Sequence, residues 1–375
     1  MEYTLRSLGS FSEMKYGKMP NKKMSSDKGK YPIFSGYRVV GYCDECNIGE
    51  QQLVVVARGV GGTGDVKLSP GACFLTNLSI AVLVDESVAL KKYLYYYFLK
   101  NNLSYLDSGS AQSQITIGDL KNVEVPLPSI ETQKKVVSIL GVIDEKINNN
   151  VAINDNLYAQ AKATTKQWIA KSTGDYELLP LSEIASINPD TYSPKEAWKY
   201  VNYLDTSSII EGCIAEIQRI TPSSEKLPSR ARRKIAPNDI VFSTVRPNQR
   251  HYGIISEPLP NMLGSTGFAV IRSKNPLVCN ELIYLCLTEN EFIEKMQQLA
   301  EQSTSTFPSI KPSDLGVCEI PCPKDQSSTS FTETLKSLFA LIAANQRENI
   351  SLSEIRDALL PKLMSGEIDV SGVQL

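Results

Sequence analysis

The sequence predicts an α+β protein in which two similar mixed domains are joined by two long helices that form an antiparallel coiled coil. Three observations support this fold class. The motif DLKNVEVPLP (Asp119–Pro128) returns as DLGVCEIPCP (Asp314–Pro323). Short β-rich runs precede each copy, and a long stretch with helical apolar periodicity follows each copy. The predicted parts are the first mixed domain, the first spacer helix, the second mixed domain, and the second spacer helix with a C-terminal tail: residues 1–128, 129–173, 174–323 and 324–375.

Length and composition limit the class of protein. A chain of 375 residues is long enough for two or three domains, and 42% hydrophobic with 21% charged residues is ordinary for a soluble protein. The apolar runs are shorter than the roughly 18 residues that a membrane-spanning helix needs. The opening MEYTLRSLGS lacks the basic and then apolar layout of a signal peptide. We therefore expect a cytoplasmic protein without a membrane segment.

Each mixed domain combines strands with one main helix. Runs such as QQLVVVA, DIVFSTV and GFAVIRS alternate with turn signals, which is typical of short strands. A helix is predicted over Leu90–Asn102 in the first domain and over Asn280–Ala300 in the second. Proline cannot donate a hydrogen bond to a sheet, so each P-x-P pair is expected to close the last strand before the long helix.

The echo also extends upstream of the proline motif. At a slightly shorter offset, VVVARG meets FSTVRP, and this aligns Arg58 with Arg246. A similarity between YTLRSL at Tyr3 and YELLPL at Tyr176 is too weak to distinguish from chance. The two half-chains are therefore expected to share one topology.

The long helices carry a coiled-coil pattern. Apolar residues recur with alternating spacings of four and three, which is typical of an a/d seam. Pro361 is expected to end or kink the second helix. The central seam residues are Leu140, Ile143, Ile147, Asn150 and Asn154 in the first helix, and Leu335, Leu338, Ile342, Asn345 and Asn349 in the second.

The direction of pairing follows from connectivity. Each seam has two asparagines at its midpoint, and both parallel and antiparallel pairing would bring the two sets together, where Asn pairs with Asn and fixes the register. A whole mixed domain separates the helices, which favours the antiparallel arrangement. The alternative is two separate amphipathic helices, each lying on its own domain.

Charge points to local contacts with DNA and not to a general polycation. The net charge is −2, yet basic residues cluster near the N-terminus and in SRARRK. The aligned arginines Arg58 and Arg246 are expected to anchor phosphates, while the loops that follow them differ, as two loops reading different sequences would. The predicted DNA-binding residues are Lys22, Lys23, Arg58, Gly61, Gly62, Thr63, Arg230, Arg232, Arg233, Arg246, Asn248, Gln249, Arg250 and His251. Solvated surface lysines and an ordinary hairpin are the alternatives.

Several catalytic and metal sites are not supported. Cys43 and Cys46 form a lone C-x-x-C, and Cys318 and Cys322 align with apolar residues of the first repeat, so no metal site is predicted. GVGGTG (residues 59–64) fits a nucleotide-binding fingerprint, but no helical pattern follows it. There is one histidine and no N-P-P-[YF] or D-P-P-[YF] motif, so an adenine methyltransferase is disfavoured.

These features together resemble the specificity subunits of type I restriction-modification systems. The resemblance rests on three segments: VPLPSIETQKKVVSILGVIDEKI at Val125–Ile147, EIPCPKDQSSTSFTETLKSLFALIAANQ at Glu319–Gln346, and LLPKLMSGEI at Leu359–Ile368. The family's Glu-Gln pair after the prolines becomes Glu131 and Gln133 in the first copy and only Gln326 in the second.

The resemblance implies a non-catalytic subunit with two target-recognition domains, each reading one half of a bipartite double-stranded DNA target. It implies docking of two modification subunits, which carry S-adenosylmethionine and methylate adenine, while this chain holds no cofactor. A restriction subunit can join such a complex. The alternatives from other classes are a coiled-coil protein–protein adaptor and a single-chain methyltransferase or nuclease. Because the net charge is near zero, we expect weak DNA binding by the isolated chain.

Overall fold

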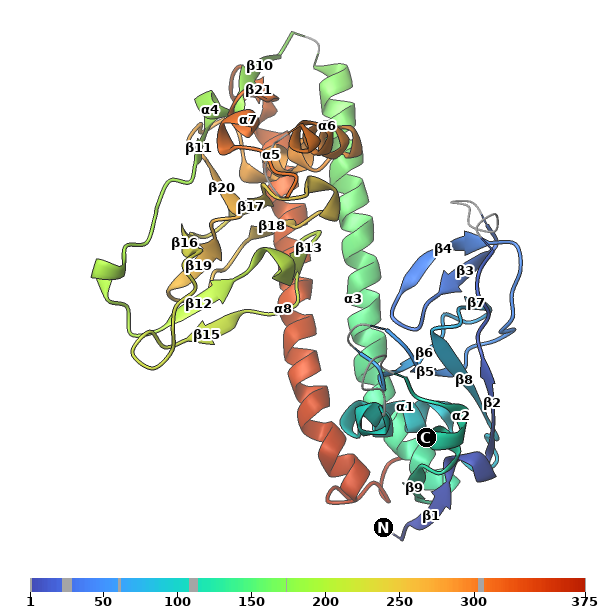
Figure 1. Cartoon of the computed structure of the whole chain (residues 1–375). Helices are drawn as coiled ribbons and strands as arrows, with labels where there is room; N and C mark the ends of the chain where they lie inside the picture. The colour runs from blue at the N-terminus through green and yellow to red at the C-terminus, as the bar shows by residue number, and fades with distance from the viewer. Residues whose placement is uncertain are drawn as a thin grey trace. The chain divides into compact units, whose positions relative to one another are not determined.

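A computed structural model describes residues 2–21, 29–59, 62–107, 114–172, 174–302 and 307–374. The chain folds as two compact units (Figure 1). Unit 1 comprises Met1–Asn148 with Asn349–Leu375, and unit 2 comprises Asn149–Glu348. The division falls inside both long helices, so each unit contains one mixed domain and one segment of each helix. The α+β class predicted from the sequence is confirmed.

The mixed domain of unit 1 is built on two small sheets. Strands β2, β8, β5 and β6 form an antiparallel sheet in that order, while β4, β3 and β7 form a second sheet in which β3 and β7 are parallel. Its elements are β1 (Thr4–Ser7), η1 (Leu8–Ser10), β2 (Ser12–Tyr16), β3 (Tyr31–Phe34), β4 (Val39–Cys43), β5 (Leu53–Val56), β6 (Val66–Leu68), β7 (Phe74–Leu75), β8 (Ser79–Val84), α1 (Lys91–Lys100), η2 (Leu103–Leu106), α2 (Ile117–Lys121) and β9 (Glu124–Leu127).

The mixed domain of unit 2 repeats this plan. One sheet has the order β11-β20-β17-β18, and the other has the order β15-β12-β19-β16 with β12 parallel to β19. Its elements are β10 (Tyr176–Pro180), α4 (Leu181–Ile184), β11 (Ala185–Ile187), η3 (Pro194–Glu196), β12 (Val201–Leu204), η4 (Thr206–Ser208), β13 (Ile209–Ile210), β14 (Cys213–Ile214), β15 (Gln218–Ile220), β16 (Ala231–Lys234), β17 (Asp239–Ser243), η5 (Pro247–Gln249), β18 (Tyr252–Ile255), β19 (Met262–Ser265), β20 (Phe268–Ser273), α5 (Asn280–Leu287), α6 (Asn290–Glu301), α7 (Pro312–Gly316), β21 (Glu319–Pro323) and η6 (Gln326–Ser328).

The recurring proline motif has the same structural role in both units. Pro126 lies in β9, with Pro128 directly after it, and Pro321 and Pro323 lie in β21. Each of these strands pairs only with the strand that begins its own domain, β1 or β10. Thr4 lies opposite Leu127, and Glu177 lies opposite Cys322. The weak similarity between the segments at Tyr3 and Tyr176 therefore reflects equivalent strands. A two-stranded ladder with a free edge tolerates proline, because no third strand needs the missing N–H.

The two long helices are α3 (Ile130–Lys171) and α8 (Thr329–Ser365). Helix α8 does not end at Pro361 but continues to Ser365, so that expectation from the sequence is corrected. The apolar residues Leu360, Leu363 and Met364 are buried in the core of unit 1. Their packing holds the last turn in place although Pro361 cannot donate a helical hydrogen bond.

Within unit 2 the helices pair in antiparallel fashion around polar and aromatic contacts. Trp168 stacks on Phe331 with ring centroids 4.4 Å apart, whereas earlier in α3 Asn154 accepts a hydrogen bond of 2.8 Å from Nδ2 of Asn345. Asn150 is 1% exposed and donates to Glu348 at 2.7 Å. Residues later in α3 thus contact residues earlier in α8, which is the antiparallel direction.

Within unit 1 the same two helices enclose a charged contact. Arg356 occupies a seam position of α8 and pairs with Asp144 of α3 at 3.3 Å, while the Tyr96 hydroxyl donates to the other carboxylate oxygen. Of the predicted seam residues, those that the structure buries are Leu140, Asn150, Leu335 and Leu338. Those that it half-buries are Ile143, Ile147, Asn154, Ile342, Asn345 and Asn349.

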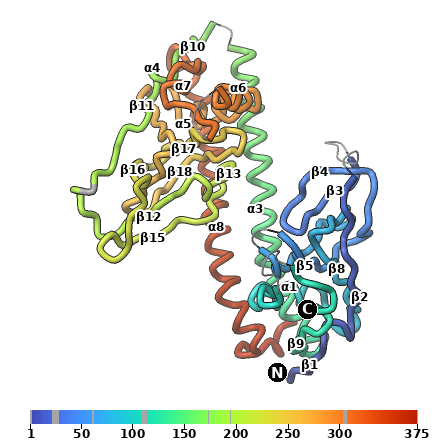
Figure 2. Tube along the Cα trace, viewed as in Figure 1, coloured from blue at the N-terminus to red at the C-terminus, as the bar shows by residue number. Residues whose placement is uncertain are grey.

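The C-terminal tail completes unit 1. The Tyr3 hydroxyl donates to the Met364 carbonyl at 3.0 Å, and Lys135 Nζ donates to the Ser371 carbonyl at 2.8 Å. Val370 is buried with the residues of α1 and α3. Figure 2 shows the red end of the chain beside the blue strand β1 in this unit. The tail therefore contributes to the core that holds the first mixed domain on its helices.

Candidate nucleic-acid interface

The loop over residues 246–251 in unit 2 has a strained backbone. Arg246 and Arg250 flank η5, and both adopt the left-handed conformation, with φ of 48° and 57°. For residues with a side chain, this region costs on the order of 1–3 kcal/mol, and such strain clusters at functional sites. Between them, Asn248 and Gln249 are exposed. The loop thus presents two amide side chains, the type that pairs with adenine edges.

The charged residues of this loop are held by neighbours. The Arg250 guanidinium pairs with Glu211 Oε1 at 3.0 Å and donates to Asn290 Oδ1 at 2.8 Å. Burial alone would lower the pKa of Arg250, but the contacts with Tyr252 and Glu211 raise it. Arg246 lies over the ring of Phe307 at 5.0 Å, and His251 Nδ1 lies 2.6 Å from the Ile209 carbonyl. These contacts fix the loop's sides while leaving its tip open.

The three arginines around β16 have three different environments. Arg230 is exposed and lines a polar cavity of about 490 Å³. Arg232 donates to the carbonyls of Ser229 and Tyr192. Arg233 points toward the interior, where burial lowers its pKa and its Nε has no hydrogen-bond partner among the described residues. Of the three, only Arg230 is fully available to a ligand.

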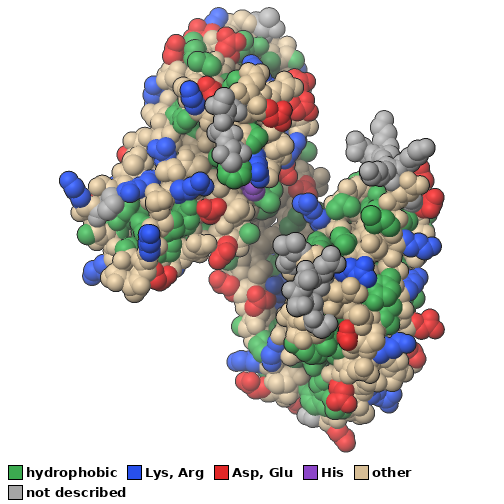
Figure 3. Space-filling view, viewed as in Figure 1, with side chains coloured by type: hydrophobic (Ala, Val, Ile, Leu, Met, Phe, Trp, Pro, Cys, Tyr) green, Lys and Arg blue, Asp and Glu red, His purple; other side chains and the backbone are tan. Residues whose placement is uncertain are grey.

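Further cations surround this sheet. Figure 3 shows Lys and Arg side chains gathered over the part of unit 2 that carries β12, β15 and β16. The exposed basic residues in this part of the chain are Lys195, Lys199, Arg219, Lys226 and Arg230. Such a patch suits contacts with phosphates, which position a protein on a duplex without specifying sequence.

The corresponding loop of unit 1 is packed against Tyr37. A Cβ on Gly62, where φ is +79°, would lie 2.8 Å from the Tyr37 ring, so close packing and backbone conformation both require glycine here. Thr63 is only 8% exposed and donates to the Gly59 carbonyl. Arg58 lies over the Tyr16 ring at 5.9 Å. The predicted residues Lys22, Lys23 and Gly61 lie outside the described residues.

The glycine run does not introduce a helix. The next element is the strand β6, which agrees with the expectation that GVGGTG is no nucleotide-binding fingerprint. The register also refines the alignment of the two loops. Arg58 bridges to Gln114, whereas Val245 bridges to Ser309, and Gln114 and Ser309 are equivalent in the proline-motif repeat. By this bridge Val245, and not Arg246, is the structural counterpart of Arg58.

Comparison with known proteins identifies the family. Residues 1–158 match the family model described as the type I restriction modification DNA specificity domain. The MjaIX specificity subunit of Methanocaldococcus jannaschii is 26% identical over 321 residues, which cover 79% of this chain and 73% of that protein. The HindI specificity subunit of Haemophilus influenzae is 21% identical over 363 residues, covering 76% and 79%.

Residues 1–158 therefore match a DNA specificity domain of type I restriction-modification systems, and the chain is similar to the specificity subunits of these systems over 76–79% of its length. Specificity subunits are the non-catalytic components of these systems, and their role is DNA target recognition. A crystal structure of the type I S subunit from M. genitalium has the same fold, with a TM-score of 0.59 at 20% identity over 97% of this chain and 96% of that one. The match to a DNA specificity domain favours DNA recognition over the adaptor alternative.

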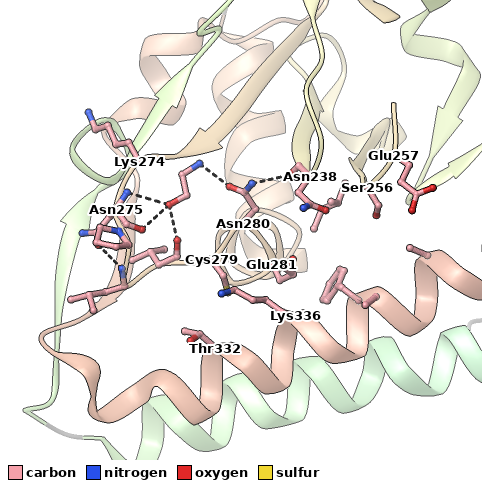
Figure 4. Close-up of a pocket in the computed structure, with 18 of the residues that line it drawn as sticks. Asn238, Ser256, Glu257, Lys274, Asn275, Cys279, Asn280, Glu281, Thr332 and Lys336 are labelled. Carbon is pink, nitrogen blue, oxygen red and sulfur yellow. Dashed lines mark hydrogen bonds between the residues drawn. The ribbon is translucent and has the colours of Figure 1, made fainter. Parts of the chain in front are cut away.

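Unit 2 has a second, larger cavity of about 740 Å³ (Figure 4). Its walls come from α8 and from the end of β20 through the start of α5. Asn280 ties the α5 end together, because it accepts from the Ser273 N–H and donates to the Asn238 carbonyl. Lys336 of α8 faces Glu281 of α5 across the cavity (Figure 4). Both basic and acidic side chains line the cavity, so its charge does not indicate a particular small ligand. Because α8 forms one wall, the cavity lies beside that long helix.

Other sites are not found in the described residues. No group of three or more His, Cys, Asp or Glu side chains is arranged to hold a metal ion in this part of the chain. Among the helices described, none combines the length and apolarity needed to cross a bilayer. Cys322 is buried and Cys318 partly buried in the core of unit 2, in keeping with the expectation that they are core residues.

The sequence did not indicate which acidic and polar side chains lie beside the predicted DNA-binding arginines. Glu211 fixes Arg250 from 39 residues away, and Glu216 and Gln218 join Arg230 at its cavity. The local sequence indicated only a turn at Glu211-Gly212, where both residues have positive φ. Nothing in the sequence indicates which loops a hairpin of this kind contacts.

Proposed function

We propose that this specificity subunit recognises a bipartite duplex, with the mixed domain of each unit contacting one half-site. The observation that carries the proposal is the repeated scaffold with unlike loops. The sheets β2-β8-β5-β6 and β11-β20-β17-β18 have equivalent orders, and the second sheets share a parallel pair, to which unit 2 adds β16. In contrast, one loop is glycine-rich and packed on Tyr37, and the other presents Asn248 and Gln249. Equal scaffolds with unequal reading loops are expected for two different half-sites.

We further propose that the long helices dock two modification subunits, which carry S-adenosylmethionine and methylate adenine, and that a restriction subunit can join them. Support comes from large apolar side chains on the helices that face solvent and not the seam. They are Val142, Ile350 and Ile355 in unit 1, and Val151, Ile153 and Leu341 in unit 2, each 46–66% exposed. Large apolar side chains exposed on a helical surface suit a protein–protein interaction site.

The recognition proposal is tested by selection from a random duplex library. The full chain, in complex with its modification subunits, is incubated with the library, and bound DNA is sequenced. We expect two short specified blocks separated by a fixed unspecified spacer. The double substitution Asn248→Ala with Gln249→Ala should relax base preference in one block only. A single continuous motif, or loss of preference in both blocks, would contradict the proposal.

The docking proposal is tested by the stoichiometry of the purified complex. Native mass spectrometry should find two modification subunits for each specificity subunit. Leu341→Asp with Ile153→Asp places charges on the exposed apolar surface of unit 2 and should reduce this number to one. Gln160→Asp, at an exposed polar position of α3, is the matched control and should retain two. Retention of two subunits by the apolar-to-charged variant would refute the assignment of this surface.

The isolated chain should bind duplex DNA weakly and with little sequence preference. Nonspecific affinities of DNA-binding proteins are about 10⁻⁴–10⁻⁶ M at physiological salt, and the salt dependence scales with the number of phosphates neutralised. Fluorescence anisotropy of a labelled duplex, titrated at several salt concentrations with and without modification subunits, measures both quantities. Tight, salt-insensitive binding by the chain alone would contradict this expectation.

A further inference from the structure

The polar cavity beside Arg230 has the composition of a base-reading pocket. It lies in unit 2 at the end of the sheet β15-β12-β19-β16 where β12 ends and β15 and β16 begin, and it has a volume of about 490 Å³. Glu216 and Gln218 approach it from β15 and the residues just before it, and Arg230 directly precedes β16. Ser207 and Ser208 of η4 form a further wall. The cavity therefore combines donors and acceptors from three separate segments.

Two polar residues of the cavity, Tyr203 and Asp205, already make hydrogen bonds within the protein. Asp205 accepts hydrogen bonds from the Tyr203 hydroxyl at 2.8 Å, from the Ser207 N–H at 3.2 Å and from the Ser207 hydroxyl at 3.0 Å. Burial first, and then the Asp205 contact, raise the pKa of Tyr203 to about 12, so its hydroxyl stays protonated and keeps donating. Asp205 and Tyr203 thus build the floor of the cavity and are not free to read a ligand.

Arg230 and Glu216 are in a different state. Both are exposed, and neither makes a side-chain hydrogen bond or an ion pair within the described residues. Three other arginines of unit 2 are paired with acids: Arg250 with Glu211, Arg272 with Asp239, and Arg347 with Glu257. An arginine and a carboxylate that line one cavity without pairing remain available for an external ligand with complementary groups.

The carboxylate distinguishes between two kinds of DNA contact. A phosphate would be repelled by Glu216, so the pair is poorly suited to the backbone of the duplex. A base pair suits it well, because arginine donates two hydrogen bonds to guanine O6 and N7, and a glutamate accepts from the cytosine N4 amino group. We propose that this cavity reads a G·C base pair in the half-site of unit 2, with Arg230 on guanine and Glu216 on cytosine.

The β13–β14 hairpin connects the cavity with the strained loop described above. Ser208 leads into β13, and its carbonyl accepts from the Ala215 N–H at 2.8 Å, which closes the base of the β13–β14 hairpin. Glu211 at the tip of that hairpin holds Arg250. One hairpin therefore connects the G·C-reading cavity to the loop that presents Asn248 and Gln249. The inference rests on the proposed function, since it assigns bases within the half-site of unit 2.

The test uses the same random-duplex selection with the full chain in complex with its modification subunits. Arg230→Gln and Glu216→Gln are the reading variants, and Glu225→Gln, at an exposed position outside the cavity, is the matched control. We expect the wild type to specify a G·C pair that both reading variants relax, each with a loss of discrimination on the order of ten-fold or more at that pair alone. The control should keep the complete motif.

The outcomes separate the two levels of the argument. If the wild type selects no two-block motif, the proposed function fails and this inference fails with it. If the motif is selected but the variants retain every G·C pair, or lose affinity equally for all sequences, only the G·C assignment is overturned. Uniform weakening would identify Arg230 as a phosphate contact. Unfolding midpoints of the variants, followed by the fluorescence of Trp168 and Trp198, should match the wild type and so exclude misfolding.

Discussion

Replacement of Asn154 or Asn345 by leucine tests what the polar residues of the helical seam contribute. In unit 2 the Asn345 amide donates to Asn154 Oδ1 at 2.8 Å, and the Asn154 amide donates to the Ile342 carbonyl at 3.4 Å. Asn154→Leu removes the acceptor of Asn345, and Asn345→Leu removes the donor to Asn154. The double variant replaces both partners by residues that are common in coiled-coil seams.

The magnitudes follow from the asymmetry of hydrogen bonding. Leaving one partner unsatisfied costs about 1–3 kcal/mol, and both side chains are half-buried, so about 1–2 kcal/mol is expected for each single variant. Replacing both partners by apolar groups is nearly neutral or stabilising. The double variant should therefore be at least as stable as either single variant, with a coupling energy of about 1 kcal/mol or more.

Unit 2 has a built-in reporter for this measurement. The chain has two tryptophans, Trp168 and Trp198, and both lie in unit 2. Trp168 stacks on Phe331 across the same pair of helices, so its fluorescence follows the separation of α3 from α8. In urea, with a slope of about 2 kcal/mol per M, each single variant should lower the midpoint by about 0.5–1 M.

Asn156→Leu supplies the matched control, because Asn156 is exposed on the same helix. Its midpoint should lie close to that of the wild type. If both single variants unfold at the wild-type midpoint, or if the double variant loses the sum of the two single losses, Asn154 and Asn345 do not act as a pair. The reasoning about the seam would then be wrong.

Three further predictions concern the rest of the chain. Arg272→Leu leaves the fully buried Asp239 without its charged partner and should destabilise unit 2 by about 3–5 kcal/mol, measured by tryptophan fluorescence in urea. The double variant Arg272→Leu with Asp239→Asn should recover part of this loss, because the buried charge is removed as well. Gln133→Ala removes bonds to the Leu90 N–H and the Val88 and Pro128 carbonyls and should cost roughly 1–3 kcal/mol, seen as faster hydrogen exchange in α1. Burial alone would raise the pKa of Asp205, but the hydrogen bonds from Tyr203 and Ser207 lower it overall; the stability advantage of the wild type over Asp205→Asn should be complete above about pH 4 and vanish as pH falls further, measured by thermal unfolding from pH 7 to pH 3.

The helices were predictable because their information is local and periodic. The seam spacing indicated the helices, and the midpoint asparagines indicated the pairing that Asn154 makes with Asn345. The partner of Asn150 was not predictable, because Glu348 lies outside the seam and reaches it with a long side chain. The continuation of α8 beyond Pro361 was not predictable for a related reason. The burial of Leu363 and Met364, which holds the last turn, depends on the core of unit 1 as a whole.

The Glu-Gln pair after the first proline motif shows a residue whose role sequence alone did not explain. Gln133 is fully buried and binds the N–H of Leu90 at the start of α1, together with two carbonyls. In the second copy the proline-motif register places Ser328 at this position, where its hydroxyl accepts from the Trp168 indole at 3.1 Å. The motif therefore fixes the first domain to its helix, and the second domain uses another contact.

At the candidate site, residue type was predictable and availability was not. The sequence placed arginines and amides in the loop over residues 246–251, but it contained no sign that Arg250 would be held by Glu211 or that Arg233 would turn inward. Both facts depend on contacts between segments far apart in the chain. Likewise, only the structure shows that Glu216 and Arg230 make no side-chain hydrogen bond or ion pair within the described residues, in contrast to Arg272 and Arg347, which are paired with acids.

The pairing of arginines also bears on where affinity for DNA arises. A cation that is already bound to a carboxylate neutralises a phosphate only after that contact is broken, so Arg250, Arg272 and Arg347 contribute little to counterion release. The exposed basic residues around β12, β15 and β16 remain for phosphates in unit 2, but the net charge of the whole chain is −2. Sequence discrimination can therefore reside in this chain while most of the binding free energy comes from the proposed modification subunits.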